Sequence, residues 1–360
     1  MSLLRKAHIF PPPSFITMPS IGFDISDRSI KYIGLKEGKN GLMLDTYGKI
    51  ALPKGLVVSG KIADIEGLRA IVKEMHKTIK RSFVRVSLPE EQVYIFNVTI
   101  PSMKSGDVRN AIMLQLEDHV PVATIDAVFD YDLFIQTDTE MTFQVAVISQ
   151  AVIDSYFTLF EDTGFTPLSF ELEAQSIARA IVPEEDKRAF MVIDFGETRT
   201  GISVVYKGLV LFTSTIDVGG HNLTEAIMKY FSLSEREALI KKEKFGLHSG
   251  TIDTGVFPAV LNLLSTLKDE VNKHYVYWHK YPFEDGTPRP KIESILLCGG
   301  EANLIGLDDY LSASLSLKVE RANPWINTNS LERYIPEMSY KESLANVTTL
   351  GLALGDFTND

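Results

Sequence analysis

Two segments of the chain share a pattern of residues that can bind a phosphate group and the metal ion that accompanies it. The first spans residues 21–31 (IGFDISDRSIK) and the second spans residues 192–203 (VIDFGETRTGIS). Each begins as an apolar strand that ends in aspartate, continues through a turn of small and hydroxylated residues, and ends in a second apolar run, which predicts a β-hairpin with a polar tip. Backbone N–H groups and hydroxyls at such a tip can surround a phosphate, while Asp24 and Asp194 can position a hydrated Mg²⁺. Two such hairpins facing each other would bind one nucleotide from both sides.

The individual hairpin residues have plainer alternatives. Asp24 and Asp194 are the expected catalytic and magnesium-positioning carboxylates, acting on the metal through water, although an aspartate before a tight turn often only caps that turn. The hydroxyl groups expected to face phosphate belong to Ser26, Ser29, Thr198 and Thr200. Serine and threonine are also ordinary turn residues, so these assignments depend on the pairing of the two hairpins.

Two glycine pairs stand where the backbone could approach a ligand. Residues 294–298 (SILLC) are typical of a buried strand, and they run into Gly299 and Gly300 before an expected helix. A glycine pair at a strand-to-helix junction lets the backbone approach a flat ligand closely, here an adenine ring. Gly219 and Gly220 precede a second expected helix in the same way.

Composition limits the class of protein. With 360 residues and 45% hydrophobic content, the chain can form two or more lobes, since single cores stop growing at roughly 250 to 300 residues. A formal net charge of −11 argues against a nucleic-acid-binding protein. Cys298 is the only cysteine, which excludes an internal disulfide, and its apolar neighbours indicate a small buried side chain. No stretch approaches the ~20 apolar residues of a membrane span and no secretory signal is evident, so we expect a cytoplasmic protein.

The first half of the chain predicts one lobe with an insertion. Three strands are expected between Ile21 and Leu52, then a helix with Asp64 as its N-cap, then a strand from Val84 to Leu88. A β-rich region follows, with strands over 92–100 and 142–148. These strands flank a helix over 105–119 whose apolar face is formed by Val108, Ile112, Leu114 and Leu116. Two helices over 151–182, the second from about Glu171, return the chain to the first lobe.

The second half predicts a second lobe. It opens with the second hairpin at Ala189 and continues with a helix from Asn222 and another that begins with the capping-box pair Ser234 and Glu237. A long helix over 257–277, a strand over 292–298, a helix over 304–311 and a short strand over 317–319 follow. The final helix, about 344–354, should pack against the first lobe.

These motifs together resemble the actin, Hsp70 and sugar-kinase ATPase superfamily, and within it the PilM family of type IV pilus assembly proteins, with the FtsA family next. Beyond the hairpins, the resemblance is carried by residues 52–64 (LPKGLVVSGKIAD), 115–121 (QLEDHVP), 171–174 (ELEA), 219–227 (GGHNLTEAI) and 299–307 (GGEANLIGL). It spans nearly the whole chain in the order of the family. It implies an α/β, actin-like ATPase (ribonuclease H-like) fold, with two lobes of duplicated core and an inserted subdomain called 1C.

The resemblance also divides the chain. The expected boundaries are 1–19 for a flexible N-terminal segment, 20–88, 151–188 and 340–360 for the first lobe (1A), 89–150 for the inserted subdomain (1C), 189–221 and 291–339 for the core of the second lobe (2A), and 222–290 for its helical subdomain (2B).

The same resemblance implies ATP and Mg²⁺ as cofactors. Glu173 would lie near the γ-phosphate and could orient an attacking water, although an acidic residue at a helix start is also favoured by the helix dipole. Lys31 stands at the spacing of a family lysine, but on an alternating strand it can also face solvent. Lys241 stands where relatives present a lysine to the ribose or adenine, unless it belongs to a charged helix face. The remaining expected nucleotide contacts are Gly196, Gly219, Gly220, Gly299, Gly300 and Glu301.

The first hairpin departs from the family pattern. Relatives have Asp-x-Gly there, whereas this chain has Ser26, followed by Asp27 and Arg28. Serine tolerates positive φ less well than glycine. Asp27 could also repel a phosphate unless it points away or neutralises Arg28. The first phosphate loop could therefore be altered or unused.

The resemblance implies a cytoplasmic ATP-binding scaffold of the type IV pilus inner-membrane complex, with weak ATPase activity at most. Its partner would be a PilN-like inner-membrane protein, whose N-terminal cytoplasmic peptide would bind in a groove between 1A and 1C and hold the chain at the membrane. An FtsA-like division protein, a type II secretion platform component and a small-molecule kinase are the alternatives. A kinase would need an aspartate base beside an acceptor hydroxyl, and no separate candidate is evident.

Overall fold

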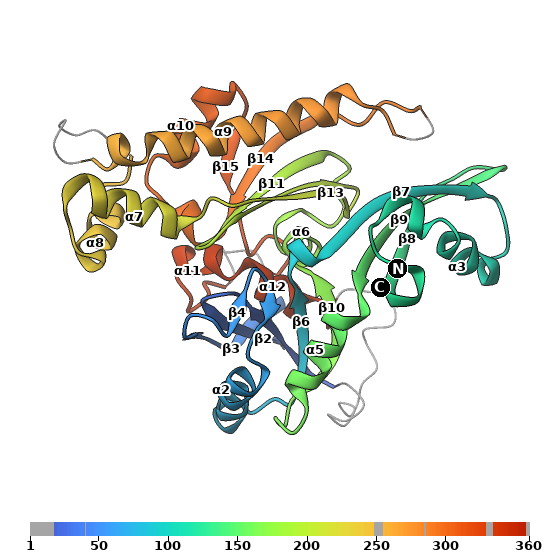
Figure 1. The fold of residues 1–360 in the computed structure, drawn as a ribbon, viewed down its shortest axis with the longest axis horizontal. Coiled ribbons are helices and arrows are strands. Elements are labelled where there is room, and N and C mark those ends of the chain that lie inside the picture. Colours follow the sequence, from blue (N-terminus) through green and yellow to red (C-terminus); the bar gives the residue numbers. More distant parts are fainter. Residues whose placement is uncertain (1–17, 40, 248–254, 284–285, 329–333, 358–360) are drawn as a thin grey trace.

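The computed structural model describes residues 18–39, 41–247, 255–283, 286–328 and 334–357. Two lobes, each with one five-stranded sheet, lie one above the other, and a third, smaller sheet extends to the side (Figure 1). The flexible segment expected over 1–19 falls almost entirely outside the described residues.

The first sheet has the strand order β10-β6-β1-β2-β3. Its strands are β1 (Ser20–Ile25), β2 (Ser29–Gly38), β3 (Gly41–Ala51), β6 (Phe83–Leu88) and β10 (Thr166–Leu172). Strands β1, β2 and β3 pair antiparallel, whereas β6 pairs parallel with both β1 and β10. The parallel arrangement places the carboxyl ends of β1 and β6 at the same edge of the sheet.

The second sheet repeats this arrangement in the order β13-β12-β11-β14-β15. Its strands are β11 (Ala189–Phe195), β12 (Thr200–Tyr206), β13 (Leu209–Ile216), β14 (Ile292–Cys298) and β15 (Val319–Arg321). The first three again pair antiparallel, and β14 again pairs parallel with its two neighbours. The duplicated core predicted from the two aspartate hairpins is confirmed.

The helices of the first lobe are α2 (Ile65–Thr78), α5 (Gln150–Phe160), α6 (Glu173–Ile181), α11 (Tyr340–Ala345) and α12 (Val347–Leu354). Helix α2 begins as predicted, because the Asp64 side chain accepts a hydrogen bond of 2.9 Å from the Gly67 N–H. The predicted last helix is two helices, broken at Asn346. Helix α12 packs against β1, β2, β6 and α6, as expected of a final helix that returns to the first lobe.

One strand of the first five-stranded sheet, β10, was not predicted. The helix expected from about Glu171 is present as α6, but it begins at Glu173 because Glu171 lies in β10. The backbone of β10 pairs with β6, a partner more than 75 residues earlier in the sequence. The local sequence of β10, TPLSFEL, contains a proline and lacks the buried apolar run that marked the predicted strands.

The helices of the second lobe are α7 (Gly220–Phe231), α8 (Glu235–Phe245), α9 (Phe257–Lys280) and α10 (Leu307–Leu315), together with the short 3₁₀ helix η3 (Gly300–Asn303). The predicted capping box is present: the Ser234 hydroxyl accepts from the Glu237 N–H at 3.4 Å, and the Glu237 carboxylate accepts from the Ser234 N–H at 2.9 Å. In Figure 1 these helices cover the upper sheet.

The insertion has its own sheet, in the order β7-β9-β8, and its own apolar core. It comprises β7 (Val93–Pro101), α3 (Ser105–Met113), α4 (Leu116–His119), β8 (Ala127–Gln136) and β9 (Glu140–Ser149), with short 3₁₀ turns η1 (Glu90–Gln92) and η2 (Thr124–Asp126). Strand β8 was not predicted, although its exposed acidic residues alternate with apolar ones. The predicted helix over 105–119 breaks after Met113, which leaves Leu114 83% exposed rather than on the apolar face.

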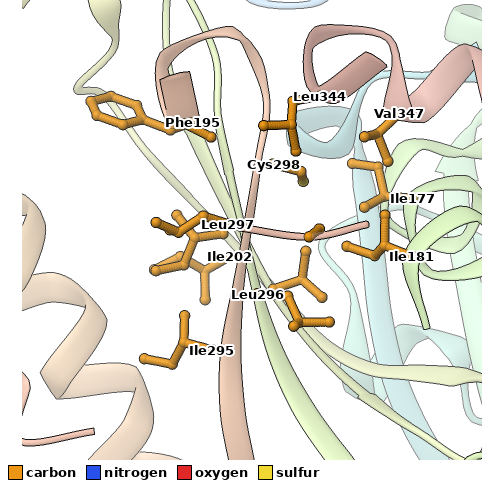
Figure 2. Close-up of a cluster of buried hydrophobic side chains, with 14 of the residues drawn as sticks. Ile177, Ile181, Phe195, Ile202, Ile295, Leu296, Leu297, Cys298, Leu344 and Val347 are labelled. Atoms are coloured by element: carbon orange, nitrogen blue, oxygen red, sulfur yellow. The ribbon is translucent and has the colours of Figure 1, made fainter. Parts of the chain in front are cut away.

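The two lobes share a continuous core at their junction. Figure 2 shows Ile295 and Leu297 of β14 on one side of the strand, and Leu296 and Cys298 on the other side toward Ile177 of α6. Helix α6 of the first lobe therefore packs against the sheet of the second. Among the described residues no helix is long and apolar enough to cross a membrane. The subdomain end points expected from the sequence remain predictions.

Candidate functional site

The tips of the two hairpins line one cleft of about 420 Å³ between the lobes. Asp24 of β1, Asp194 of β11 and Gly299 after β14 all lie in it, although they are far apart in the sequence. A larger cavity of about 640 Å³ also lies between the lobes, but none of the predicted site residues lines it. The predicted chemistry therefore belongs to the smaller cleft.

The predicted residues that line this cleft are Asp24, Ser26, Ser29, Lys31, Glu173, Asp194, Gly196, Thr198, Gly220, Gly299, Gly300 and Glu301. Three predicted residues do not line it: Thr200, Gly219 and Lys241.

The two hairpins close with the same turn. The Ser26 N–H donates to the Ser29 carbonyl at 2.9 Å, and the Gly196 N–H donates to the Arg199 carbonyl at 3.0 Å. Neither Ser26 nor Gly196 has a positive φ. Serine therefore replaces the family glycine at position 26 without backbone strain. The Ser26 hydroxyl donates to the Ser29 carbonyl at 3.0 Å and rigidifies the turn.

Asp27 points away from the first turn. Its carboxylate accepts from the N–H groups of Ser59 at 3.3 Å and Gly60 at 3.0 Å, in the hairpin formed by β4 (Val57–Val58) and β5 (Lys61–Ile62). Of the two alternatives considered for Asp27, the structure has the first: it points away, and the cation that it faces is Arg199, at 3.5 Å, and not Arg28. Asp27 does not line the cleft, so it leaves the first turn open to a phosphate.

Asp24 is a buried carboxylate with two partners. Its Oδ1 accepts from the Ser87 hydroxyl at 2.7 Å, and its Oδ2 lies 3.7 Å from Lys31 Nζ, the residue directly opposite on β2. Lys31 therefore turns into the cleft. In the second hairpin Gly201 stands opposite Asp194, so the lysine has no counterpart there. The Cys298 thiol lies 4.0 Å from Asp194 Oδ1, and burial raises the pKa of this thiol well above its usual range.

Burial, together with the crowding of carboxylates, raises the pKa of two acids in the cleft. Burial raises the pKa of Asp194; Lys31 opposes this and Asp24 adds to it. Burial likewise raises the pKa of Glu173 well above its ordinary value, with Arg199 opposing and the nearby acids adding. Both shifts follow from gathering like charges where water is scarce. A cation placed between these groups would favour their ionised forms.

Glu173 occupies the first turn of α6 and lines the cleft, where a carboxylate could accept a proton from water. Its neighbour Glu171 has a different role. Glu171 accepts from Arg85 at 3.1 Å and from Arg179 at 2.6 Å, in an ion-pair network beneath α12. Because Glu171 lies in β10, an effect of the α6 helix dipole can apply only to Glu173.

Thr200 and Lys241 are corrections to the predicted site. Thr200 is buried and its hydroxyl donates to the Val218 carbonyl at 2.6 Å, because the position corresponds to the core residue Ile30 in the first hairpin. The Lys241 ammonium lies over the Phe231 ring, 4.4 Å from its centre. The next residue, Lys242, turns into the cleft instead.

Lys242 joins the two glycine regions. Its Nζ lies 2.8 Å from Glu301 Oε1 and donates to the Gly220 carbonyl at 3.2 Å. Lys241 was the residue predicted for this position. Helical spacing places adjacent residues about 100° apart, so Lys242 faces the cleft where Lys241 does not.

The backbone amides of the first glycine pair are already used. The Gly219 N–H donates to Asn222 Oδ1 at 2.8 Å, and the Gly220 N–H donates to the Gly196 carbonyl at 3.0 Å. Gly219 also packs against the backbone of residues 197–199, so it supports the hairpin from behind. The pair therefore fixes the hairpin to α7, and only Gly220 borders the cleft.

The sequence reasoning did not single out Arg199, Glu90 or Glu91. Arg199 lies in the tip of the second hairpin with its side chain 15% exposed, and its guanidinium pairs with Glu91. Glu90 is buried and accepts from the Ala174 N–H at 3.2 Å. Glu90 and Glu91 could have been identified from their position in the sequence. They follow the carboxyl end of β6, which lies beside the carboxyl end of β1 in the sheet.

The donor set fits a hydrated magnesium ion. Within the described residues, no group of three or more histidine, cysteine or acidic side chains is arranged to hold a metal directly. Asp24 and Asp194 instead border a polar cleft with room for water and phosphate oxygens. Mg²⁺ commonly keeps several waters and uses one or two carboxylates together with substrate phosphates.

Two lobes with matching sheets around an aspartate-lined cleft define an actin-like ATPase fold. Solved structures of this kind include the ethanolamine utilization protein EutJ of Carboxydothermus hydrogenoformans (TM-score 0.55, 16% identity, 96% of this chain and 90% of that chain). Another is an MreB of Spiroplasma citri bound to ADP (TM-score 0.54, 14% identity, 93% and 95%).

The sequence narrows this class to one family. Residues 22–357 match the family model of the type IV pilus assembly protein PilM, and the chain belongs to that family. The structure is similar to the PilM-PilN type IV pilus biogenesis complex (TM-score 0.78, 21% identity, 95% of this chain and 99% of that chain). The chain is also 19% identical over 345 residues to the cell division protein FtsA of Staphylococcus epidermidis, covering 84% of this chain and 74% of FtsA.

Proposed function

We propose that this chain is a nucleotide-binding scaffold of type IV pilus assembly, which binds ATP with Mg²⁺ between its two lobes. The observation that carries the proposal is the pair of matching turns at Ser26 and Gly196, which close with equivalent hydrogen bonds and border a single cleft. A nucleotide bound there would contact both lobes, and would therefore favour the conformation in which they are close together.

In this proposal Asp24 and Asp194 hold the metal through water, and Lys31 offsets their charge. When bound, Mg²⁺ would supply charge neutralisation for the phosphates. Glu173 is the candidate to orient a water for hydrolysis, but burial, together with the acids around it, raises its pKa against the effect of Arg199 and disfavours its ionised form. Weak ATPase activity at most follows from this, and the scaffold role does not require turnover.

Isothermal titration calorimetry with ATP and MgCl₂ tests the nucleotide proposal. We expect the parent protein to bind and Asp194→Ala to lose at least about tenfold in affinity, since a carboxylate that positions the metal is removed. Asp269→Ala is the matched control, because Asp269 lies on α9 with its side chain 66% exposed. Equal affinities for the parent protein and Asp194→Ala would refute the assignment.

The second part of the proposal concerns the partner. A solved structure similar to this chain is a complex of PilM with PilN. We infer that a PilN-like inner-membrane protein binds this chain through its N-terminal cytoplasmic peptide, where the insertion meets the first lobe. The chain would thereby be held at the inner membrane without a spanning helix of its own.

The structure offers suitable backbone and side chains there. Strands β8 and β10 are the end strands of their sheets, and α5 contacts both of them. An extended peptide can add to such an edge through main-chain hydrogen bonds and gain specificity from apolar side chains. Exposed apolar side chains are available in these three elements: Leu133 (46% exposed), Phe157 (53%) and Leu168 (37%).

A synthetic peptide of the N-terminal cytoplasmic segment of the PilN homologue, labelled for fluorescence polarisation, tests this part. We expect Leu168→Lys to weaken peptide binding at least about tenfold, because it places a charge among apolar anchors. Leu261→Lys is the control, since Leu261 is similarly exposed (42%) but lies on α9. A point substitution is preferable to deleting residues 90–150, because the insertion also contacts β13 and contributes Glu90 to the cleft. Unchanged binding by Leu168→Lys would place the partner elsewhere.

A further inference from the structure

One partly buried arginine connects the three parts of the molecule at the cleft. Arg199 belongs to the second lobe, where it forms part of the tip of the second hairpin and lines the cleft. Its guanidinium pairs with Glu91 in η1, the 3₁₀ turn at the start of the insertion. It also lies 3.5 Å from Asp27 of the first hairpin. Both contacts are ion pairs, and each leads to a different part of the chain.

The charge of Arg199 is held by the carboxylates around it. Burial opposes the charge, but Glu173 and Glu91, followed by Asp27 and Asp24, raise the pKa of the guanidinium. The same arginine lowers the pKa of Glu173 and Glu91 against the effect of burial. Arg199 is thus a cation shared among several acids, and no single acid is its only partner.

A shared cation of this kind can be redistributed by an incoming anion. The planar guanidinium binds carboxylates and phosphates with the same bidentate geometry, so a phosphate placed at the hairpin tips competes with the carboxylates for it. The terminal phosphate of a nucleoside triphosphate is dianionic near neutral pH and outcompetes a single carboxylate on charge. A diphosphate has no group at that position.

We propose that Arg199 senses the terminal phosphate: it pairs with Glu91 and Asp27 when that phosphate is absent, and turns to the phosphate when a nucleoside triphosphate is bound. This inference rests on the proposed nucleotide binding. Under this proposal Arg199, and not the metal-positioning pair Asp24 and Asp194, makes the site bind a nucleoside triphosphate more tightly than a diphosphate.

The exchange would also be transmitted to the insertion. Glu91 loses its cation when Arg199 turns away, and the adjacent Glu90 accepts from the Ala174 N–H of α6 at 3.2 Å. Turn η1 itself contacts β13. A change of charge at Glu91 therefore acts where the insertion joins both lobes, and would change the protection of the first residues of β7.

Calorimetry with ATP and with ADP, each with MgCl₂, tests the proposal on the full chain. Arg199→Gln should lower ATP affinity about tenfold or more and ADP affinity less than about threefold, because only ATP loses a charged contact. Glu91→Gln should raise ATP affinity several-fold and leave ADP affinity unchanged, because it removes a competitor for Arg199. Arg199→Lys should give an intermediate ratio, since it keeps the charge without the bidentate fork. Arg188→Gln, whose side chain is 58% exposed outside the cleft, is the control.

Hydrogen exchange supplies the second measurement. ATP, but not ADP, should change the exchange of amides over residues 90–95 in the parent protein, and Arg199→Gln should abolish that difference. The inference would be overturned if Arg199→Gln lost the same affinity for ATP and for ADP, or if Glu91→Gln bound ATP more weakly than the parent protein. Either result would show that Arg199 has only a structural role, while the proposal of nucleotide binding would stand. A parent protein that binds neither nucleotide would overturn both.

Discussion

Gly299 and Gly300 are adjacent, and the structure predicts opposite consequences for replacing each with alanine. Gly299 has φ 89° and ψ 170°, a conformation essentially restricted to glycine. A Cβ there would lie 2.4 Å from Asp194 Oδ1 and 2.5 Å from the Phe195 carbonyl oxygen. At Gly300 a Cβ would meet nothing closer than the Ala345 Cβ at 4.0 Å, and φ is not positive.

The cost at each position can be added from these contacts. Gly299→Ala combines backbone strain of about 1–3 kcal/mol with overpacking of about 1–3 kcal/mol, so we expect a loss of about 2–6 kcal/mol. At about 2–4 °C per kcal/mol for a large domain, the melting temperature should fall by at least about 4 °C. Gly300→Ala should leave it within about 1 °C of the parent protein, because the added methyl group has space.

Ligand binding should separate the two variants further. Gly300 borders the cleft, so a methyl group there would meet an adenine ring and should weaken Mg-ATP binding about fivefold or more. Differential scanning fluorimetry and calorimetry on both variants provide the two measurements. A Gly299→Ala protein that melts with the parent protein would refute the strain argument. Normal ATP affinity in Gly300→Ala would refute the placement of the adenine.

Three other changes test neighbouring features. Ser26→Gly should leave Mg-ATP affinity, measured by calorimetry, within about twofold of the parent protein, because the turn is unstrained at serine. The same change should lower the free energy of unfolding, followed by thermal melting, by about 0.5–1 kcal/mol, because glycine adds backbone freedom to the unfolded chain. Because the pKa of Glu173 is raised, the folded nucleotide-free protein binds more protons than the unfolded chain above pH 4.5, the ordinary pKa of a glutamate. The melting temperature should therefore fall as the pH rises above that value. In a pH series, Glu173→Gln should make this fall shallower. Glu171→Gln should lower the free energy of unfolding by about 3 kcal/mol at neutral pH, since it leaves Arg85 and Arg179 short of a partner. Because the pKa of Glu171 is lowered in the folded protein, this difference from the parent protein should shrink below about pH 4. Chemical denaturation of both proteins at pH 7 and pH 3.5 measures the difference.

The sequence predicted the parts of the fold that repeat or that carry local signals. The two hairpins were visible because each combines an apolar run, an aspartate and a turn. The starts of α2 and α8 were visible because Asp64 and Ser234 are caps whose partners lie three residues away. Strand β10 was not visible, because its sequence TPLSFEL contains a proline and none of its residues is fully buried, so it has no apolar run.

The residues of the candidate site were likewise predicted only where the local sequence determines their position. Residues whose position follows from the hairpin itself, such as Asp24 and Asp194, could be placed from the sequence. Thr200 could not, because the side chain that faces the core depends on the strand register. Arg199 and Glu91 could not be recognised as partners, since their contact depends on how the second lobe and the insertion meet.

The charge balance of the cleft predicts that the metal decides whether a nucleotide binds. Asp24, Glu173 and Asp194 line the cleft. Lys31 lies 3.7 Å from Asp24, and the cations Arg199 and Lys242 are already paired with Glu91 and Glu301. A metal-free triphosphate would add negative charge beside these carboxylates, and each like-charge pair at about 4 Å costs roughly 1 kcal/mol in water and about 4 kcal/mol at an effective dielectric constant of 20.

A magnesium ion between the phosphates and the aspartates reverses the sign of these contacts. We therefore expect EDTA to lower ATP affinity of the parent protein by about tenfold or more. Asp194→Ala should show the opposite trend for the metal-free nucleotide: it should bind ATP in EDTA as tightly as the parent protein or more tightly, because one repelling carboxylate is gone, although it binds Mg-ATP more weakly. Calorimetry in EDTA and in MgCl₂ gives the four affinities. Equal ATP affinity of the parent protein in EDTA and in MgCl₂ would show that the phosphates do not lie beside these aspartates.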